Sequence, residues 1–90
     1  MPITYRPTFS VSEAASQSGV SKNQLRDWDD KCLLPYVFRV SVGKHQHRRF
    51  CEVDVFVARR IRAYQREGFI LPVAAKRAMA DARKEFELEN

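Results

Sequence analysis

The stretch that decides the fold is FSVSEAASQSGVSKNQLRDWDDKCLLP, residues 9–35. Ser10 is followed three residues later by Glu13, which is the capping-box pattern of a helix start. Phe9 stands just before this box, where an apolar residue packs back onto the helix. The pattern predicts a short helix that begins after Ser10 and ends at Gly19, because glycine readily adopts the positive φ of a helix terminus.

The same signature recurs at once, with Ser21 as the cap and Gln24 in place of the glutamate. A second helix is predicted to run through Leu25 and Trp28 and to stop at residues 33–35, which end in proline. Two short helices that are joined through a glycine form a helix-turn-helix.

Residues 36–50, YVFRVSVGKHQHRRF, change to a period of two. Phe38, Val40 and Val42 alternate with other residues, and Gly43 follows them. Alternation around a glycine-containing turn predicts a two-stranded β-ribbon with charges at its tip, which is the form of a wing. An irregular basic loop is the alternative.

Two more helices are predicted after the ribbon. Apolar residues recur at a spacing of three to four from Glu52 to Glu67, and Gly68 stops this helix. The next helix begins near Pro72, because proline suits a first helical turn.

These elements predict a mostly α fold of the winged helix-turn-helix class, with about four helices and a two-stranded β-ribbon wing. The domain is expected over residues 9–80, after an extended N-terminal arm over residues 1–8. Residues 81–90 form either the end of the last helix or the start of a dimerisation segment.

The charge of the chain is unevenly distributed. The 90 residues, enough for one small domain, have a formal net charge of +5. Residues 36–50 contain four Lys/Arg and both histidines but no acid, whereas residues 78–90 contain four acids and two bases. A basic centre is typical of a protein that binds a polyanion, although a solvated basic loop has the same composition.

No apolar run approaches the ~20 residues of a membrane span, and the polar N-terminus does not resemble a signal peptide. We therefore expect a cytoplasmic protein with no membrane partner. Cys32 and Cys51 are then expected to be free thiols. Together with His45 and His47 they lack the spacing of a zinc site, so we predict no metal.

Catalytic motifs are missing from the sequence as well. It contains no glycine-rich phosphate loop, and its acids are scattered without a visible partner constellation. The sequence therefore predicts a protein that is not an enzyme and that uses no cofactor.

Residues 9–35 resemble the opening of a MerR-type DNA-binding domain, which reads aromatic–small–apolar–x–Glu-Ala-Ala, then Gly-Val-Ser, Leu-Arg, and a leucine pair before proline. HRRF at 47–50 is similar to the close of the family's wing, and GFIL at 68–71 to its later turn. The resemblance covers about residues 9–80. The departures are Gln24 for threonine, Asp27 in the aromatic pair, Gln46 for the wing glycine and Ile70 for serine.

The resemblance implies a transcription regulator that binds specific sequences of double-stranded DNA, with the second helix in the major groove and the wing on the backbone or minor groove. It also implies a homodimer or cooperative copies on DNA, association with the nucleoid, and RNA polymerase or a recombinase as a further partner. Sensor-bearing family members continue into a long dimerisation helix and an effector domain, whereas ten residues, 81–90, follow here. A minimal member and a piece of a longer protein are both consistent with this.

The second helix supplies one group of expected DNA contacts, namely Ser21, Lys22, Asn23 and Gln24. Lysine donates to guanine, and asparagine or glutamine pairs with adenine, at about 1–3 kcal/mol of discrimination. The alternative for Ser21 is capping alone. Arg26 resembles the family's phosphate-contacting arginine, and its alternative is an ion pair with Asp29 or Asp30.

Trp28 either packs beneath the ribbon or points its indole N–H at a phosphate. Arg48 aligns with the family's wing arginine, whereas Arg49 is expected to face away and Phe50 to lie in the core. The expected wing contacts are Arg39, Lys44, His45, His47, Arg48 and Arg49.

Three other functions compete with this hypothesis. An excisionase-like architectural factor would use the same domain to bend DNA for a recombinase. A protein-interaction adaptor would need a neutral or acidic recognition surface, which the basic residues 36–50 oppose. A module for single-stranded RNA would need an exposed aromatic platform, which the sequence lacks.

Overall fold

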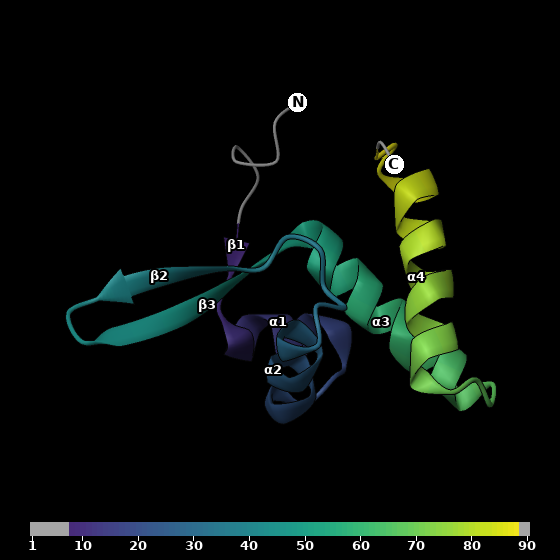
Figure 1. The fold of residues 1–90 in the computed structure, drawn as a ribbon, viewed down its shortest axis with the longest axis horizontal. Helices are drawn as coiled ribbons and strands as arrows, with labels where there is room; N and C mark the ends of the chain where they lie inside the picture. Colours follow the sequence, from purple (N-terminus) through teal and green to yellow (C-terminus); the bar gives the residue numbers. More distant parts are fainter. Residues whose placement is uncertain (1–7, 89–90) are drawn as a thin grey trace.

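The computed structural model describes residues 8–88 and confirms the predicted fold class. Within these residues, four helices and three short strands follow one another (Figure 1). They are β1 (Thr8–Phe9), α1 (Val11–Ser18), α2 (Lys22–Asp30), β2 (Phe38–Val42), β3 (His45–Cys51), α3 (Glu52–Arg66) and α4 (Leu71–Glu85).

The two predicted caps define the helix-turn-helix. The Ser10 hydroxyl accepts the backbone N–H of Glu13 at 3.2 Å, and the Glu13 carboxylate accepts the N–H of Ser10 at 2.9 Å. Gly19 has a φ of 75°, so it ends α1 in the conformation that favours glycine. Ser21 then caps α2 through the N–H of Gln24 at 3.1 Å.

The wing is an antiparallel ribbon with a third strand that the sequence analysis missed. β2 pairs with β3 from Phe38 opposite Arg49 to Val42 opposite His45, around a two-residue turn in which Gly43 has a φ of 60°. β1 pairs with the other edge of β3, which gives the order β1-β3-β2. Thr8, expected in the N-terminal arm, belongs to this sheet, and the remainder of that arm lies outside the described residues.

α3 and α4 pack side by side, with α4 at the end of the molecule away from the ribbon (Figure 1). α4 begins at Leu71 after Ile70, which makes no side-chain capping bond, and Pro72 lies in its first turn. The helix continues through Asp81 to Glu85, so this part of the final segment is the end of the last helix. Glu89 and Asn90 lie outside the described residues.

The core joins all four helices to the base of the ribbon. Leu25, Phe50 and Ile61 are fully buried, and Trp28 is 2% exposed. Four alanines of α4 are buried, which allows its close approach to α3: Ala74, Ala75, Ala78 and Ala82. None of the helices in residues 8–88 has the length and apolar character needed to cross a membrane.

Candidate nucleic-acid interface

The start of α2 is exposed, as a helix that enters a DNA groove requires. Lys22 and Asn23 are exposed, whereas Gln24 is half-buried and lies 3.3 Å from the Ser21 hydroxyl through its Oε1. Ser21 therefore has the capping role that was its alternative. The backbone N–H groups of a first turn also carry partial positive charge, which adds to that of Lys22.

Arg26 lies one turn further along α2 and is exposed. Its Nη1 approaches Asn23 Oδ1 at 3.5 Å, the limit of a hydrogen bond. Asp29 and Asp30, the expected alternative partners of Arg26, are bound by arginines of the wing instead. The positive charge of Arg26, near the exposed start of α2, is therefore not paired with either of these two aspartates.

Arg26 and the wing border one hollow of about 210 Å³. Because Lys22 precedes Arg26 by four residues, it lies on the same side of α2. The helix and the wing thus present cations on one side of the molecule. Besides Arg26, the hollow is lined by Ser10, Val11, Gln46, His47, Arg48 and Arg49.

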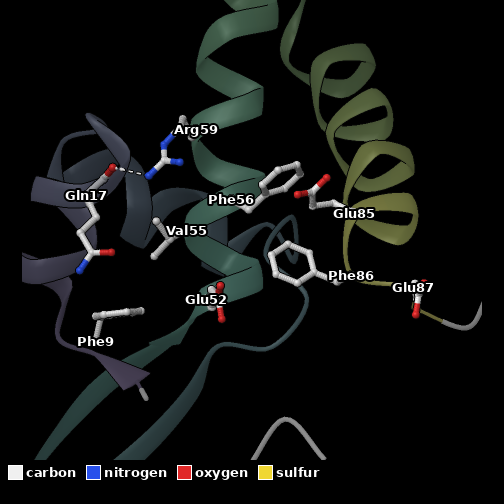
Figure 2. Close-up of a pocket in the computed structure, with 9 residues that line it drawn as sticks. All are labelled: Phe9, Gln17, Glu52, Val55, Phe56, Arg59, Glu85, Phe86 and Glu87. Atoms are coloured by element: carbon white, nitrogen blue, oxygen red, sulfur yellow. Dashed lines mark hydrogen bonds between the residues drawn. The ribbon is translucent and has the colours of Figure 1, made fainter. Parts of the chain in front are cut away.

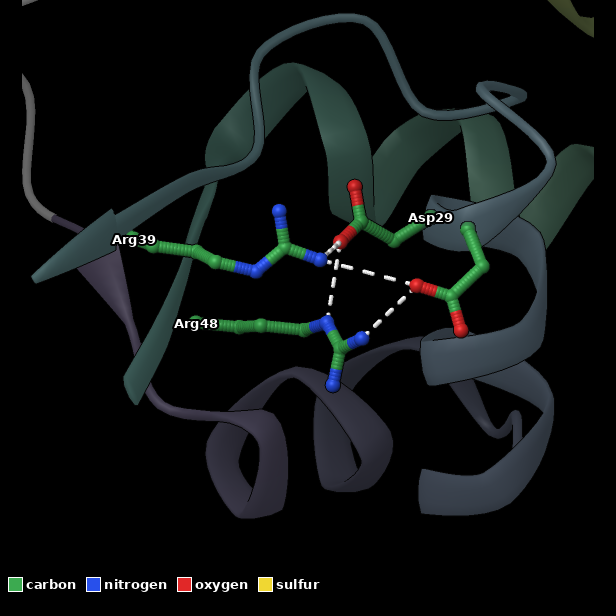
Figure 3. A network of polar contacts seen from close by, with 4 residues as sticks. Asp29, Arg39 and Arg48 are labelled. Atoms are coloured by element: carbon green, nitrogen blue, oxygen red, sulfur yellow. Dashed lines mark hydrogen bonds and ion pairs between the residues drawn. The ribbon is translucent and has the colours of Figure 1, made fainter. Parts of the chain in front are cut away.

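Arg39 and Arg48 are held by two aspartates at the end of α2 (Figure 3). Arg48 donates from Nε to Asp29 Oδ2 at 2.9 Å and from Nη2 to Asp30 Oδ1 at 2.8 Å. Arg39 Nη2 lies 3.3 Å from Asp29 Oδ2 and 3.5 Å from Asp30 Oδ1. Partial burial lowers the pKa of Arg48, but the bonds to both carboxylates outweigh it, so its pKa is raised overall.

Arg49 also borders this hollow, while its side chain reaches β1. Its Nε donates to Thr8 Oγ1 at 3.2 Å and its Nη2 to the Thr8 carbonyl at 3.0 Å, which ties β3 to β1.

The pKa of Glu13 lies below its ordinary value because Ser10 donates from its backbone and hydroxyl, and the nearby charge of Arg49 adds to this.

Lys44 and His45 lie at the tip of the ribbon, His47 lies two residues further along β3 opposite Val40, and all three of these expected contact residues are exposed. Trp28 is different, because it is buried in the core, as its packing alternative required. The structure therefore gives Trp28 a supporting position beneath the interface rather than one on its surface.

Asp54 is a buried carboxylate whose role the sequence analysis did not recognise. One of its oxygens accepts the backbone N–H of Tyr36 and the other accepts that of Cys51, both at 2.8 Å. Burial raises the pKa of Asp54 to about 6, although these two donors oppose the shift. The carboxylate thereby joins the segment that enters β2 to the start of α3.

The hollow in Figure 2 lies over α3, between the α1 side and the end of α4, and does not suit a polyanion. Arg59 donates to the Gln17 carbonyl at 2.7 Å across one side of it. Three glutamates line the hollow together with this single arginine: Glu52, Glu85 and Glu87. We therefore do not include it in the interface.

The cysteines within residues 8–88 are both free thiols, as predicted. Cys32 is exposed, whereas Cys51 is buried and lies 3.5 Å from the Tyr36 carbonyl. Burial, followed by the charge of Asp54, raises the pKa of Cys51 and keeps its thiol protonated. In the part of the chain that the structure describes, no three His, Cys, Asp or Glu side chains form a candidate metal site.

The sequence contained a feature from which the pairing of Asp29 and Asp30 with the wing could have been predicted. A two-residue turn at Gly43 places Arg39 directly opposite Arg48 in the ribbon. Like charges that lie opposite each other destabilise a sheet, so this register calls for nearby acids. Asp54 gave a weaker signal, because an acid near the start of a helix is ordinarily explained by the helix dipole.

Comparison with known proteins supports the fold described above. The model of the MerR HTH family of regulatory proteins matches residues 9–81. A solved structure of HiNmlR, a MerR family regulator lacking the sensor domain and bound to promoter DNA, is similar with a TM-score of 0.66 and 28% sequence identity. The similarity covers 83% of this chain and 55% of that chain.

A MerR family transcriptional regulator from Bacillus cereus is similar with a TM-score of 0.63 and 25% identity, over 81% of this chain and 52% of that one. The chain thus spans about half the length of these two solved structures. Comparison with curated proteins finds no match. Since the family model covers the helix-turn-helix, the wing and most of α4, the chain belongs to the MerR HTH family of regulatory proteins.

Proposed function

We propose that the protein is a transcription regulator that binds specific sequences of double-stranded DNA. In this proposal, α2 enters the major groove and the β2–β3 wing lies on the backbone or in the minor groove. The observation that carries the proposal is the shared hollow, because Arg26 of α2 and Arg48 and Arg49 of β3 border it together. The similarity to a regulator solved with promoter DNA supports the choice of duplex DNA as the polyanion.

The exposed residues divide into two roles. Lys22 and Asn23 stand at the exposed start of α2 and are proposed to read bases. Arg26 and the wing residues are proposed to bind phosphates, which position the protein without reading sequence. The proposed wing contacts are Arg39, Lys44, His45, His47, Arg48 and Arg49.

The proposal is tested with fluorescence anisotropy of labelled duplexes, after selection of a preferred site from a random duplex library. Arg26→Ala is expected to weaken binding to every duplex and to reduce the slope of log affinity against log salt by about 0.9, because one phosphate contact is lost. Asn23→Ala is expected to relax the preference at particular base pairs, at a cost of about 1–3 kcal/mol at the preferred site.

Arg83→Ala is the matched control, because Arg83 is an exposed arginine in the last turn of α4, away from the ribbon. It removes the same charge and is expected to change the salt slope much less than Arg26→Ala does. Equal slopes for the parent and Arg26→Ala would show that this side of α2 does not contact DNA.

We propose that more than one copy binds each site. One small domain buries about 600–1,000 Å² of its surface on DNA, which gives limited affinity on its own. Sizing of the complex on the selected duplex measures the number of copies, and a dimer or adjacent copies are expected.

Action on DNA would also place the protein in the cytoplasm, at the nucleoid. RNA polymerase remains a proposed partner, to be tested by transcription from the selected site.

A further inference from the structure

Four charged side chains join the wing to the last turn of α2. The cluster contains two arginines and two aspartates, with Arg39 and Arg48 on the ribbon and Asp29 and Asp30 on the helix. Figure 3 shows both guanidinium groups reaching from the ribbon toward Asp29. The two charges of each sign cancel, so the cluster is neutral as a whole.

The contact between Arg48 and Asp29 is the most buried of the cluster. Their side chains are 22% and 11% exposed, so water and salt screen this pair less than a surface pair. Arg48 also uses two different nitrogens for the two carboxylates, at 2.9 and 2.8 Å. Such geometry is that of strong, charge-assisted hydrogen bonds.

A carboxylate and a phosphate use the same guanidinium donors. Arginine recognises both anions through parallel N–H donors. A DNA phosphate that approaches Arg48 must therefore either displace Asp29 and Asp30 or meet an arginine whose charge is already neutralised. Both outcomes reduce the contribution of Arg48 to DNA binding.

The other arginines of the shared hollow differ in this respect. Arg26 makes its hydrogen bond to the neutral amide of Asn23, and Arg49 makes its bonds to neutral oxygens of Thr8. Neither of these bonds is to a carboxylate. The aspartates thus act selectively on the two arginines that lie opposite each other in the ribbon.

We infer that Asp29 and Asp30 are an intramolecular counterion that competes with DNA phosphates for Arg39 and Arg48. The pair thereby lowers the sequence-independent affinity of the domain and holds the wing against α2 in the free protein. The inference rests on the proposed function, because it concerns the strength of binding to duplex DNA.

The test uses the full chain and a duplex of arbitrary sequence. Asp29→Asn and the double variant Asp29→Asn/Asp30→Asn are compared with the parent between 50 and 200 mM salt. With a slope of about 0.9 per added phosphate contact, the ratio of variant to parent affinity should be about 3.5-fold larger at 50 mM than at 200 mM when the loss of one carboxylate releases one positive charge for a phosphate, and about 12-fold larger when the loss of both releases two. Both variants should bind more tightly than the parent at 50 mM.

Asp81→Asn is the control for the change in net charge. Asp81 accepts from Arg60 Nε at 3.1 Å and from the Tyr64 hydroxyl at 2.5 Å, so its substitution also frees one arginine. This site joins α3 to α4, away from the ribbon (Figure 1). Its affinity ratio should therefore stay close to one across the salt range.

A second readout does not depend on DNA. In the free parent, NMR should show the Nε–H of Arg48 protected from exchange with water, and Asp29→Asn should remove that protection. An unprotected Nε–H in the parent would overturn the inference.

The outcomes with DNA separate the two ideas. If the parent binds the duplex and the double variant binds it with the same salt slope, the counterion role is wrong while the proposed function stands. If neither the parent nor the double variant binds any duplex, both are wrong.

Discussion

Substitution of Asp54 tests how the base of the wing is anchored. Its carboxylate is fully buried and accepts the backbone N–H groups of Tyr36 and Cys51, one on each oxygen. Burial raises its pKa from 3.8 to about 6, with the two donors opposing the shift. The folded protein therefore binds a proton at Asp54 more tightly than the unfolded chain does.

The sign of the pH dependence follows from this difference. Between pH 3.8 and about 6, the folded state holds the proton and the unfolded state has lost it, so the free energy of unfolding falls as the pH rises. A difference of about 2 pKa units corresponds to roughly 3 kcal/mol at 1.36 kcal/mol per unit. The extra stability is complete below the unfolded pKa and is lost as the pH rises through the folded pKa.

The assay compares urea unfolding of the parent and of Asp54→Asn from pH 3.5 to 7.5. The introduced amide does not titrate, and the other acids are common to both proteins, so the difference between the two free energies isolates Asp54. The parent's free energy of unfolding, relative to the variant's, should fall by roughly 2 kcal/mol from pH 4 to pH 6 and become level only above about pH 7. The carbon-13 shift of the carboxyl group should titrate near pH 6 in the folded parent.

Two results would refute this reasoning. A difference that is independent of pH would mean that the two backbone donors fully offset burial, so that the pKa of Asp54 is the same in the folded and unfolded states. A difference that rises with pH would mean that the two backbone donors outweigh burial, so that the pKa is lowered rather than raised.

Three further substitutions test the fold. Ser10→Ala removes the hydroxyl that caps α1 and should lower the free energy of unfolding, measured with urea, by about 1 kcal/mol. Ser12→Ala, at an exposed position on the same helix, should change this free energy little. Ile61→Ala should cost about 2–5 kcal/mol because the side chain is fully buried, and Ile70→Ala, at a residue 68% exposed, should cost far less; equal losses would contradict the core described above. Gly43→Ala should destabilise the ribbon by about 1–2 kcal/mol, and Gly43→Asn less, because asparagine tolerates a φ of 60°; thermal unfolding followed by circular dichroism measures both.

Sequence reasoning located most of the elements because their signals are local. The capping box at Ser10, the positive φ of Gly19 and the alternation before Gly43 depend on residues close in the chain. The two residues of β1 were missed, because a strand of this length has no period to detect. Its pairing depends on β3, which is distant in the chain: Thr8 lies opposite Cys51.

The site was predictable only in part. The sequence alone determined the family, through the resemblance of residues 9–80, and it also determined the capped start of α2 and a basic ribbon after it, since composition and short-range spacing encode these two features. Only the tertiary structure decided which charges meet. Asp29 pairs with Arg48 instead of Arg26, because tertiary packing brings Arg48 of the ribbon within 2.9 Å of this carboxylate. The burial of Asp54 likewise depends on tertiary packing, because one of its two donors, the backbone N–H of Tyr36, comes from a segment that is distant in the chain.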